Sequence, residues 1–202
     1  MRVVLASGNA GKVREFSALL GNLGWEVIPQ DELDVAEAEE TGLSFVENAI
    51  LKARNAAEQT GLPALADDSG IVVDALHGQP GIYSARFAGK PGDSAANNAK
   101  LLAAMQGVPA GLRTARFRCC IVFVRDAADP VPLIAEAGWE GSILEQPAGG
   151  QGFGYDPLFY VPTHDCSAAE LDAAEKNRIS HRGQALQILT DLLRADSKRE
   201  QL

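Results

Sequence analysis

The N-terminal segment, residues 2–12, reads RVVLASGNAGK and predicts the first unit of an α/β fold. Its apolar start, Arg2 to Ala6, is typical of a short buried strand, and the polar loop after it leads into a helix. That helix carries apolar residues at helical spacing, namely Val13, Phe16, Leu19 and Leu20. A loop that opens a helix presents backbone N–H groups and a positive dipole end, so it is a ready site for an anion such as phosphate.

The loop Ser7-Gly8-Asn9-Ala10-Gly11-Lys12 is a near miss to the Walker phosphate-binding loop. Ala6 stands where the first glycine would be, and Val13 stands where the magnesium-binding Ser or Thr would be. The pattern therefore disfavours a P-loop kinase or ATPase, although Asn9 and Lys12 add donors for an anion. The alternative is that this loop only connects the strand to the helix and binds no ligand.

The rest of the chain predicts further strands and helices with both hairpin and crossover connections. Strands are expected at residues 25–28, 64–66, 71–76, 115–124 and 133–141, and helices from 44 to 59, from 93 or 94 to 105, and from 180 onward. Ser44 with Glu47 and Ser167 with Glu170 form capping-box patterns. We expect a single α/β domain around a mixed sheet over residues 1–202, with a frayed tail at 197–202.

Composition limits the classes of function. The chain has 18 basic and 27 acidic residues, a net charge of −9, which disfavours extended binding to nucleic acid. The first apolar run is too short for a signal peptide, and no window predicts a membrane span, so we expect a cytoplasmic protein without a membrane partner. The three cysteines, two of them adjacent at Cys119 and Cys120, are expected to be reduced, with this pair packed in or against a sheet.

Two neighbouring carboxylates, in Asp67-Asp68-Ser69-Gly70, interrupt apolar strand-like segments. Because side chains alternate along an extended chain, we expect one Asp to face a cleft and the other to bind backbone donors or to lie behind it. An Asp here, joined by an acid from the run Glu37 to Glu40, would suit magnesium that arrives with a triphosphate. An Asx turn between two strands is the alternative.

Two later segments also carry candidate binding groups. In Gly152-Phe153-Gly154-Tyr155-Asp156-Pro157, the glycines would let a ligand approach the backbone, and an aromatic ring could stack on a base. Lys176-Asn177-Arg178 and Ser180-His181-Arg182-Gly183 gather hydrogen-bond donors near the start of the last helix. For the first segment, the alternative is that its aromatic rings only fill the core. For the second, the alternative is that its basic residues form a solvated surface.

Taken in order, these motifs resemble the inosine triphosphate pyrophosphatase family, and most closely its bacterial branch of XTP/dITP diphosphatases. The resemblance covers nearly the whole chain, with Ser7 where many relatives have Thr. It rests on Ser7-Gly8-Asn9-x-x-Lys12, Glu39-Glu40-Thr41-Gly42, Glu47-Asn48-Ala49-x-x-Lys52, Ala66-Asp67-Asp68-Ser69-Gly70, Pro80-Gly81-Ile82-Tyr83-Ser84-Ala85-Arg86, Gly152-Phe153-Gly154-Tyr155-Asp156-Pro157 and Ser180-His181-Arg182-Gly183.

The resemblance implies an elongated, curved mixed sheet flanked by helices, with two lobes, a nucleotide cleft between them, and a homodimer. The apolar and aromatic stretch Ile82 to Phe87 is a candidate for the dimer interface. The implied activity is magnesium-dependent hydrolysis of ITP, dITP and XTP to the monophosphate and pyrophosphate, which cleanses the nucleotide pool.

The resemblance also implies roles for individual residues. Asp68 would be the general base and a magnesium ligand, and Glu40 would help to hold the magnesium. The remaining residues expected to bind substrate are Ser7, Gly8, Asn9, Ala10, Gly11, Lys12, Lys52 and Ser69 with the phosphates, and Phe153, Gly154, Tyr155, Asp156, Lys176, His181 and Arg182 with the base.

Base selection follows from hydrogen-bond chemistry. Hypoxanthine and xanthine carry a 6-oxo acceptor that Lys176 and Arg182 can serve, whereas adenine would present a 6-amino donor to them. Guanine shares the 6-oxo group, and the sequence does not identify the residue that excludes it. Two alternatives are a septum-inhibitor-type pyrophosphatase of modified pyrimidine or methylated guanine nucleotides, and a non-catalytic nucleotide sensor or RNA-binding module.

Overall fold

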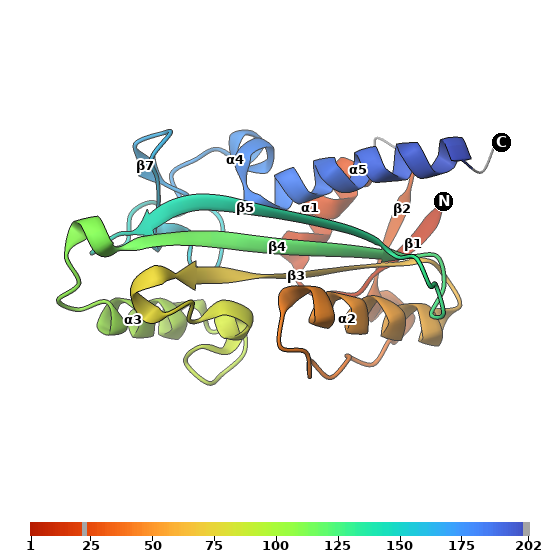
Figure 1. Cartoon of the computed structure of the whole chain (residues 1–202), viewed down its shortest axis with the longest axis horizontal. Coiled ribbons are helices and arrows are strands. Elements are labelled where there is room, and N and C mark those ends of the chain that lie inside the picture. Colours follow the sequence, from red (N-terminus) through yellow and green to blue (C-terminus); the bar gives the residue numbers. More distant parts are fainter. Residues whose placement is uncertain (22–23, 200–202) are drawn as a thin grey trace. The chain divides into compact units, whose positions relative to one another are not determined.

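The structure, a computed structural model, describes residues 1–21 and 24–199 (Figure 1). Its strands form a seven-stranded sheet in the order β2-β1-β3-β4-β5-β6-β7. The strands are β1 (Arg2–Leu5), β2 (Glu26–Pro29), β3 (Ala64–Val73), β4 (Thr114–Val124), β5 (Leu133–Ile143), β6 (Phe159–Val161) and β7 (Cys166–Ser167). The α-helices are α1 (Ala10–Gly21), α2 (Phe45–Thr60), α3 (Ser94–Ala104), α4 (Ala173–Ile179) and α5 (His181–Arg199). Short 3₁₀ helices are η1 (Gln30–Leu33), η2 (Asp74–Leu76), η3 (Gly81–Arg86), η4 (Ala110–Leu112) and η5 (Asp156–Leu158).

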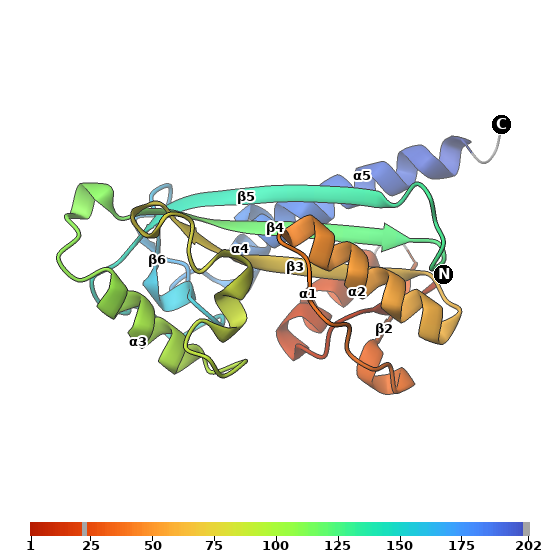
Figure 2. The same cartoon turned by 60° about the horizontal axis from the view of Figure 1, so that its bottom comes forward.

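The sheet is mixed, as the sequence predicts. β1 pairs in parallel with both β2 and β3, whereas β5–β6 and β6–β7 are antiparallel pairs. β4 and β5 are neighbours joined by residues 125–132, and their arrows point in opposite directions in Figures 1 and 2, so the predicted hairpin forms. The predicted fold class, a mixed sheet flanked by helices, is confirmed.

The chain forms two compact units. Unit 1 comprises residues 1–68, 119–137 and 184–202, of which 1–21, 24–68, 119–137 and 184–199 are described, and unit 2 comprises 69–118 and 138–183. The chain passes from one unit to the other within β3, β4, β5 and α5. The boundary in β3 falls between Asp68 and Ser69. The polar motif Asp67-Asp68-Ser69-Gly70 is therefore divided, with its two aspartates in unit 1 and its last two residues in unit 2.

Unit 1 has an apolar cluster on each face of its strands. Phe16 of α1 and Leu189 of α5 share a cluster with Cys119, whereas Ala53 of α2 shares the other cluster with Cys120. Figures 1 and 2 show α2 and α5 on opposite sides of the strands. The two adjacent cysteines are free and buried and point to opposite faces, as strand alternation predicts.

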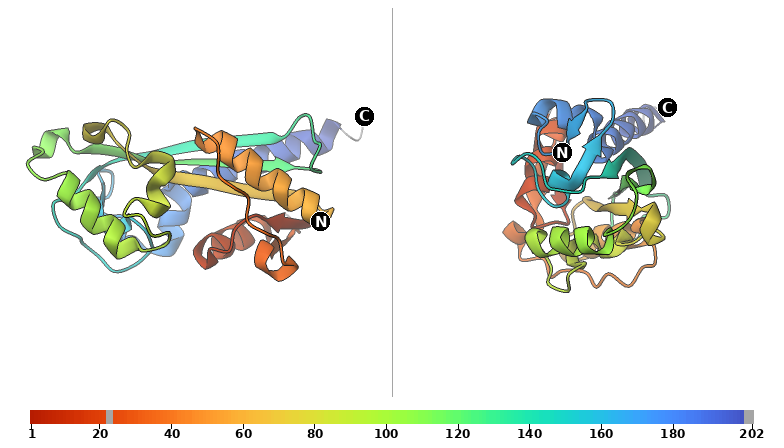
Figure 3. Two further views of the ribbon diagram at one scale, coloured as in Figure 1. Left: turned by 90° about the horizontal axis from the view of Figure 1, so that it is seen from below. Right: turned by 90° about the vertical axis from the view of Figure 1, so that its left-hand side faces the viewer.

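Unit 2 is built on a third, more aromatic cluster. Phe117 of β4, Trp139 of β5 and Phe159 of β6 pack together, with ring centroids 4.7–6.3 Å apart. Leu101 of α3 closes this cluster from one side, and Figure 3 shows α3 on the side of the strands away from β7 and α4. Aromatic rings in mutual contact therefore form a central part of this core.

Local capping signals locate two helix starts. Ser44 accepts a hydrogen bond from the backbone N–H of Glu47, and the Glu47 carboxylate accepts one from the N–H of Leu43. Asp93 caps α3 through the N–H of Ala96. Both starts are confirmed where the sequence predicts them, because a cap depends only on residues within one turn of each other.

Two local predictions are wrong. The strands predicted at 64–66 and 71–76 are one unbroken strand, β3, which ends at Val73 before η2, and the alternative of an Asx turn in the Asp67 to Gly70 segment is excluded as well. The Ser167 and Glu170 pattern does not begin a helix. Glu170 accepts a hydrogen bond from the N–H of Ser167, but α4 begins at Ala173, after its cap Asp172.

The last helix, α5, buries Ala185, Leu186, Leu189 and Leu193 on one side, as predicted. It continues to Arg199, so the first three residues of the expected frayed tail are helical, whereas residues 200–202 and the predicted core side chain of Leu19 lie outside the described parts. Within the described residues, no helix combines the length and the apolar character that crossing a membrane requires.

Gly183 in α5 provides a test of the packing in unit 2. A Cβ atom at this position would overlap the carbonyl oxygen of Asn177 in α4, so the two backbones meet only because position 183 has no side chain. We expect Gly183→Ala to lower the free energy of unfolding by about 1–3 kcal/mol in urea titrations. Gly21→Ala is the control, because Gly21 ends α1 and no atom of the described residues lies within 4 Å of its added Cβ. Equal stability of the two variants would contradict this account of the α4–α5 contact.

Candidate functional site

Two buried carboxylates in β3 organise the polar centre of unit 1. Asp67 is 1% and Asp68 is 7% exposed, and apolar residues of the same strand surround them in sequence. Burying a carboxylate is unfavourable unless a positive group and hydrogen bonds compensate it. Two lysines from different helices, Lys12 of α1 and Lys52 of α2, provide that compensation.

Asp67 is the inner member of the pair. Its Oδ1 accepts a hydrogen bond from Nζ of Lys12 at 2.6 Å, and the thiol of Cys119 donates to its Oδ2 at 3.5 Å. The Asp67 side chain has no exposed surface, whereas that of Lys12 is 17% exposed. Asp67 therefore fits the predicted role of the residue behind the site, and it fixes the direction of Lys12.

Asp68 faces the second lysine. Nζ of Lys52 donates to Oδ1 of Asp68 at 2.7 Å, to Oε1 of Glu40 at 3.2 Å, and to the backbone carbonyl oxygen of Asp67 at 3.0 Å. Within the described chain, Oδ2 of Asp68 is buried and has no hydrogen-bond partner. Asp68, Glu40 and Lys52, which the sequence places in three separate motifs, thus lie together.

Burial controls the acid–base properties of this group. It raises the pKa of the Asp68 carboxyl above its ordinary value, although the neighbouring ammonium of Lys52 acts in the opposite direction. Burial alone would lower the pKa of Lys52, but the charge of Asp68 and the hydrogen bond to it, with Glu40 and Asp67, raise that pKa instead. Lys52 is therefore a permanent cation, and Asp68 is a stronger base than a free aspartate.

The oxygens of Asp68 and Glu40 fit a hard cation. Among the residues that the structure describes, no cluster of three or more His, Cys, Asp and Glu side chains is arranged to hold a metal. Magnesium, however, commonly uses only one or two carboxylates and takes its other ligands from water and substrate phosphate. The buried, unpartnered Oδ2 of Asp68 is an available ligand atom for such an ion.

The N-terminal loop has the features of an anion site. Oδ1 of Asn9 accepts hydrogen bonds from the N–H groups of Gly11 and Lys12, so Asn9 caps α1 through its oxygen, and only its amide nitrogen can donate to a phosphate. In the described structure the N–H groups of Gly8 and Ala10 donate to no protein acceptor. They are the backbone donors that the loop can offer to an anion.

Asn48 is a residue that sequence reasoning missed. It is fully buried in α2, one turn before Lys52, and its Oδ1 accepts a hydrogen bond from the N–H of Gly42 at 2.8 Å. A Cβ at position 42 would collide with Asn48 and Glu47, so this loop lies flat on the helix. Asn48 thereby anchors the loop that carries Glu40. A polar residue among the alanines of the buried helix face was the available signal.

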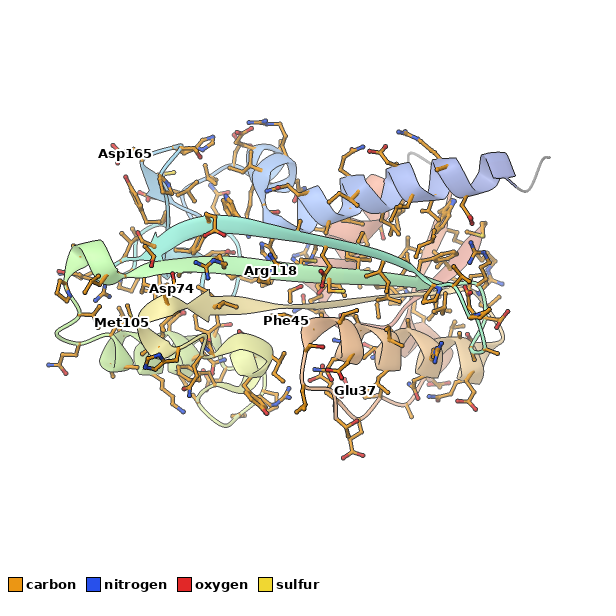
Figure 4. The ribbon with its side chains drawn as sticks, in the orientation of Figure 1. Glu37, Phe45, Asp74, Met105, Arg118 and Asp165 are labelled. Carbon is orange, nitrogen blue, oxygen red and sulfur yellow. The ribbon has the colours of Figure 1, made fainter. Side chains whose placement is uncertain are left out.

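Of the acidic run from Glu37 to Glu40, only Glu40 lies beside Lys52. Glu40 is partly buried beside Lys52, whereas Glu37 and Glu39 are exposed in the loop that Figure 4 shows beside α2, where Glu37 is labelled. The structure also brings the Asp31 carboxylate so close to Gly8 that a side chain at position 8 would overlap it. Sequence reasoning did not find this contact, which explains the glycine at position 8.

A second polar group lies in unit 2. Nζ of Lys176 donates to Oδ2 of Asp156 at 2.6 Å, and the same oxygen accepts from the N–H of Phe153 at 2.7 Å. Lys176 and Arg182 both lie over the Phe153 ring, at 4.9 and 5.5 Å from its centroid, and Arg182 donates to Oγ of Ser69 at 3.4 Å. Lys176 and Arg182 are buried, so the alternative of a solvated basic surface is wrong for these two residues, whereas Arg178 is exposed.

The predicted base-binding residues divide into two kinds. Phe153 is 39% exposed and is available to a ligand. In contrast, Tyr155 is buried, and its hydroxyl donates to the carbonyl oxygen of Ser84, so this ring is a core plug. His181 stacks on Phe117 at 4.7 Å and 9° in the aromatic core. The core thus fixes the orientation of the His181 ring.

Comparison with known proteins relates this geometry to a family. The sequence pattern of the Ham1 family matches residues 3–192. The chain belongs to the Ham1 family. It is 62% identical to a protein of Thioalkalivibrio sulfidiphilus named dITP/XTP pyrophosphatase, over 96% of this chain and 98% of the relative.

Solved Ham1 structures show the same fold. A HAM1 protein from Coxiella burnetii is 51% identical, with a TM-score of 0.90 over 96% of this chain and 99% of that chain. The Ham1 protein of Staphylococcus aureus is 38% identical, with a TM-score of 0.86 over 97% of this chain and 100% of that chain. The resemblance inferred from the seven motifs is therefore confirmed at the level of the family.

The pair of Asp67 and Lys12 gives a prediction about stability. Asp67→Ala would leave the mostly buried ammonium of Lys12 without its carboxylate, and we expect it to lower the free energy of unfolding by about 3 kcal/mol in urea titrations. Asp74→Ala is the matched control, because Asp74, labelled in Figure 4, forms an exposed ion pair with Arg116. Such surface pairs add little stability. A loss for Asp67→Ala no larger than that for Asp74→Ala would show that the buried pair does not stabilise unit 1.

Proposed function

We propose that this protein hydrolyses purine nucleoside triphosphates with a 6-oxo base, namely ITP, dITP and XTP, to the monophosphate and pyrophosphate. The observation that carries the proposal is the buried Asp68 carboxylate, which has one free oxygen and lies next to Glu40 and Lys52. The names of the relatives agree with it, since the Thioalkalivibrio protein and one of Escherichia coli O157:H7, 56% identical, are both named dITP/XTP pyrophosphatase.

Unit 1 supplies the proposed chemistry on the triphosphate. Asp68 and Glu40 would hold magnesium, and the bound ion would neutralise the charge that develops on the phosphates. Asp68, whose pKa burial raises, accepts a proton from the attacking water or orients that water toward the α-phosphorus. Lys12 and the N–H groups of Gly8 and Ala10 bind phosphate oxygens.

Unit 2 supplies the proposed recognition of the base. The Phe153 ring offers a stacking surface, and the buried cations Lys176 and Arg182 favour an oxygen acceptor such as the 6-oxo group. Adenine would bring a 6-amino donor toward these two cations, and an unsatisfied buried donor costs about 1–3 kcal/mol. Asp156 holds Lys176 in the orientation that this recognition needs.

A homodimer and a cytoplasmic location stay predictions. The contact surface proposed for the dimer is residues Ile82 to Phe87, most of which form η3. Tyr83 is 54% exposed there, which supports this choice.

Pyrophosphate release from a panel of nucleotides tests the proposed function. We expect release from ITP, dITP and XTP that requires magnesium and stops with a chelator, and about 10- to 100-fold lower kcat/KM for ATP, in line with the cost of about 1–3 kcal/mol. Asp68→Asn removes the proton acceptor with little change in shape, so it should abolish turnover while the protein remains folded by circular dichroism. Equal turnover of ATP and ITP would contradict the base selection. Binding of ITP without any product over hours would instead favour a non-catalytic sensor.

A further inference from the structure

Lys52 already uses its full hydrogen-bonding capacity inside the protein. An ammonium has three N–H donors, and Nζ of Lys52 has three acceptors, on Glu40, Asp67 and Asp68. The side chain is only 14% exposed. In the ligand-free protein Lys52 therefore has no donor to offer to a phosphate.

Lys12 differs in this respect. Its Nζ donates to two atoms of one residue, Oδ1 and the backbone carbonyl oxygen of Asp67, and so keeps a third N–H group for a ligand. Among the described residues Lys12 forms no ion pair with either proposed magnesium ligand, whereas Lys52 bridges both of them. The two lysines thus have different relations to the carboxylates.

We propose that the ammonium of Lys52 occupies the cation position between Glu40 and Asp68 in the ligand-free protein, and that a metal–triphosphate complex binds by exchange. Glu40 and Asp68 would then hold the metal in place of the Lys52 ammonium, and the ammonium would donate to phosphate oxygens. This inference rests on the proposed function, because it concerns the metal and the triphosphate that function requires.

Electrostatic repulsion favours the exchange. Two cations close to the same pair of carboxylates repel each other, so a metal that binds both side chains must move the ammonium away. A displaced, mostly buried ammonium is costly unless it finds another acceptor. The triphosphate provides that acceptor, whereas a free metal ion does not.

The exchange has a consequence for selectivity. Free magnesium should bind weakly to the nucleotide-free protein, because it would leave Lys52 without a partner, but magnesium carried by a triphosphate should bind well. Lys52 would then couple the two parts of the substrate, so the protein responds to the complex and not to the free ion. The linkage is mutual, since each component strengthens the binding of the other.

The alternative arrangement leaves Lys52 in place. The metal would bind the free Oδ2 of Asp68, and Lys52 would stay on Oδ1 of the same carboxylate. In that case Lys52 stabilises the orientation of the ligand, and its removal would not improve metal binding. The two arrangements therefore predict opposite effects of the same substitution.

Magnesium titration of the nucleotide-free protein distinguishes them. In Lys52→Met, we expect the Kd for free Mg²⁺, measured by calorimetry and by the Mg²⁺-dependent rise in Tm, to be about tenfold lower than in the wild type. Lys12→Met is the matched control, since it removes the same charge from the same site without vacating the position between Glu40 and Asp68. Its Kd should fall by no more than about threefold.

Lys52→Gln provides a second route if Lys52→Met does not fold, because the Gln amide is neutral but can still donate to the Asp67 carbonyl oxygen. In Lys52→Gln we expect the same decrease in the Kd for free Mg²⁺. Unchanged or weaker Mg²⁺ binding in the folded Lys52 variant, or equal tightening in Lys12→Met, would overturn the exchange. Neither outcome depends on turnover, so failure of the exchange is distinct from failure of the proposed function, which pyrophosphate release by the wild type tests.

Discussion

The polar centre of unit 1 depends on the compensation of two adjacent, buried carboxylates by two lysines. Asp67 and Asp68 lie in the middle of an apolar strand, where an unpaired carboxylate would strongly destabilise the fold. Lys12 of α1 pairs with Asp67, and Lys52 of α2 pairs with Asp68. The same two helices contribute apolar side chains to the clusters on the two faces of the sheet. Packing of the two helices against the sheet therefore also fixes the positions of the charges.

The same strand connects the proposed chemistry to the proposed recognition. Asp68 ends the part of β3 that belongs to unit 1, and the next residue, Ser69, begins unit 2, where its hydroxyl accepts a hydrogen bond from Arg182. Arg182 lies with Lys176 over the Phe153 ring, and Asp156 holds Lys176. Each unit thus contains a buried carboxylate paired with a lysine, one group suited to phosphate and metal and the other to a base.

The sequence predicted the features that depend on short-range interactions. The caps at Ser44 and Asp93 and the alternation at Cys119 and Cys120 need only neighbouring residues, and all are confirmed. The mixed sheet and the family also followed from the order of strands and motifs.

Features that depend on distant residues could not be predicted in the same way. The Asp67 to Gly70 segment can continue as strand because Lys12, 55 residues away in the chain, compensates Asp67, and no local pattern contains that information. Ser167 and Glu170 have the pattern of a cap, but the chain turns again before the helix that Asp172 begins. Tyr155 and Phe153 belong to one motif, yet only the packing of unit 2 determines which ring is buried.

The division of roles between the two units is the central claim, and the ratio of kcat/KM for ITP to that for ATP tests it most directly. Lys12→Ala removes a phosphate donor common to all nucleotides, so it should lower both values alike and leave the ratio unchanged within about twofold. Lys176→Ala removes a donor to the 6-oxo group, so it should reduce the ratio by about tenfold or more. A changed ratio in Lys12→Ala, or an unchanged ratio in Lys176→Ala, would contradict the account.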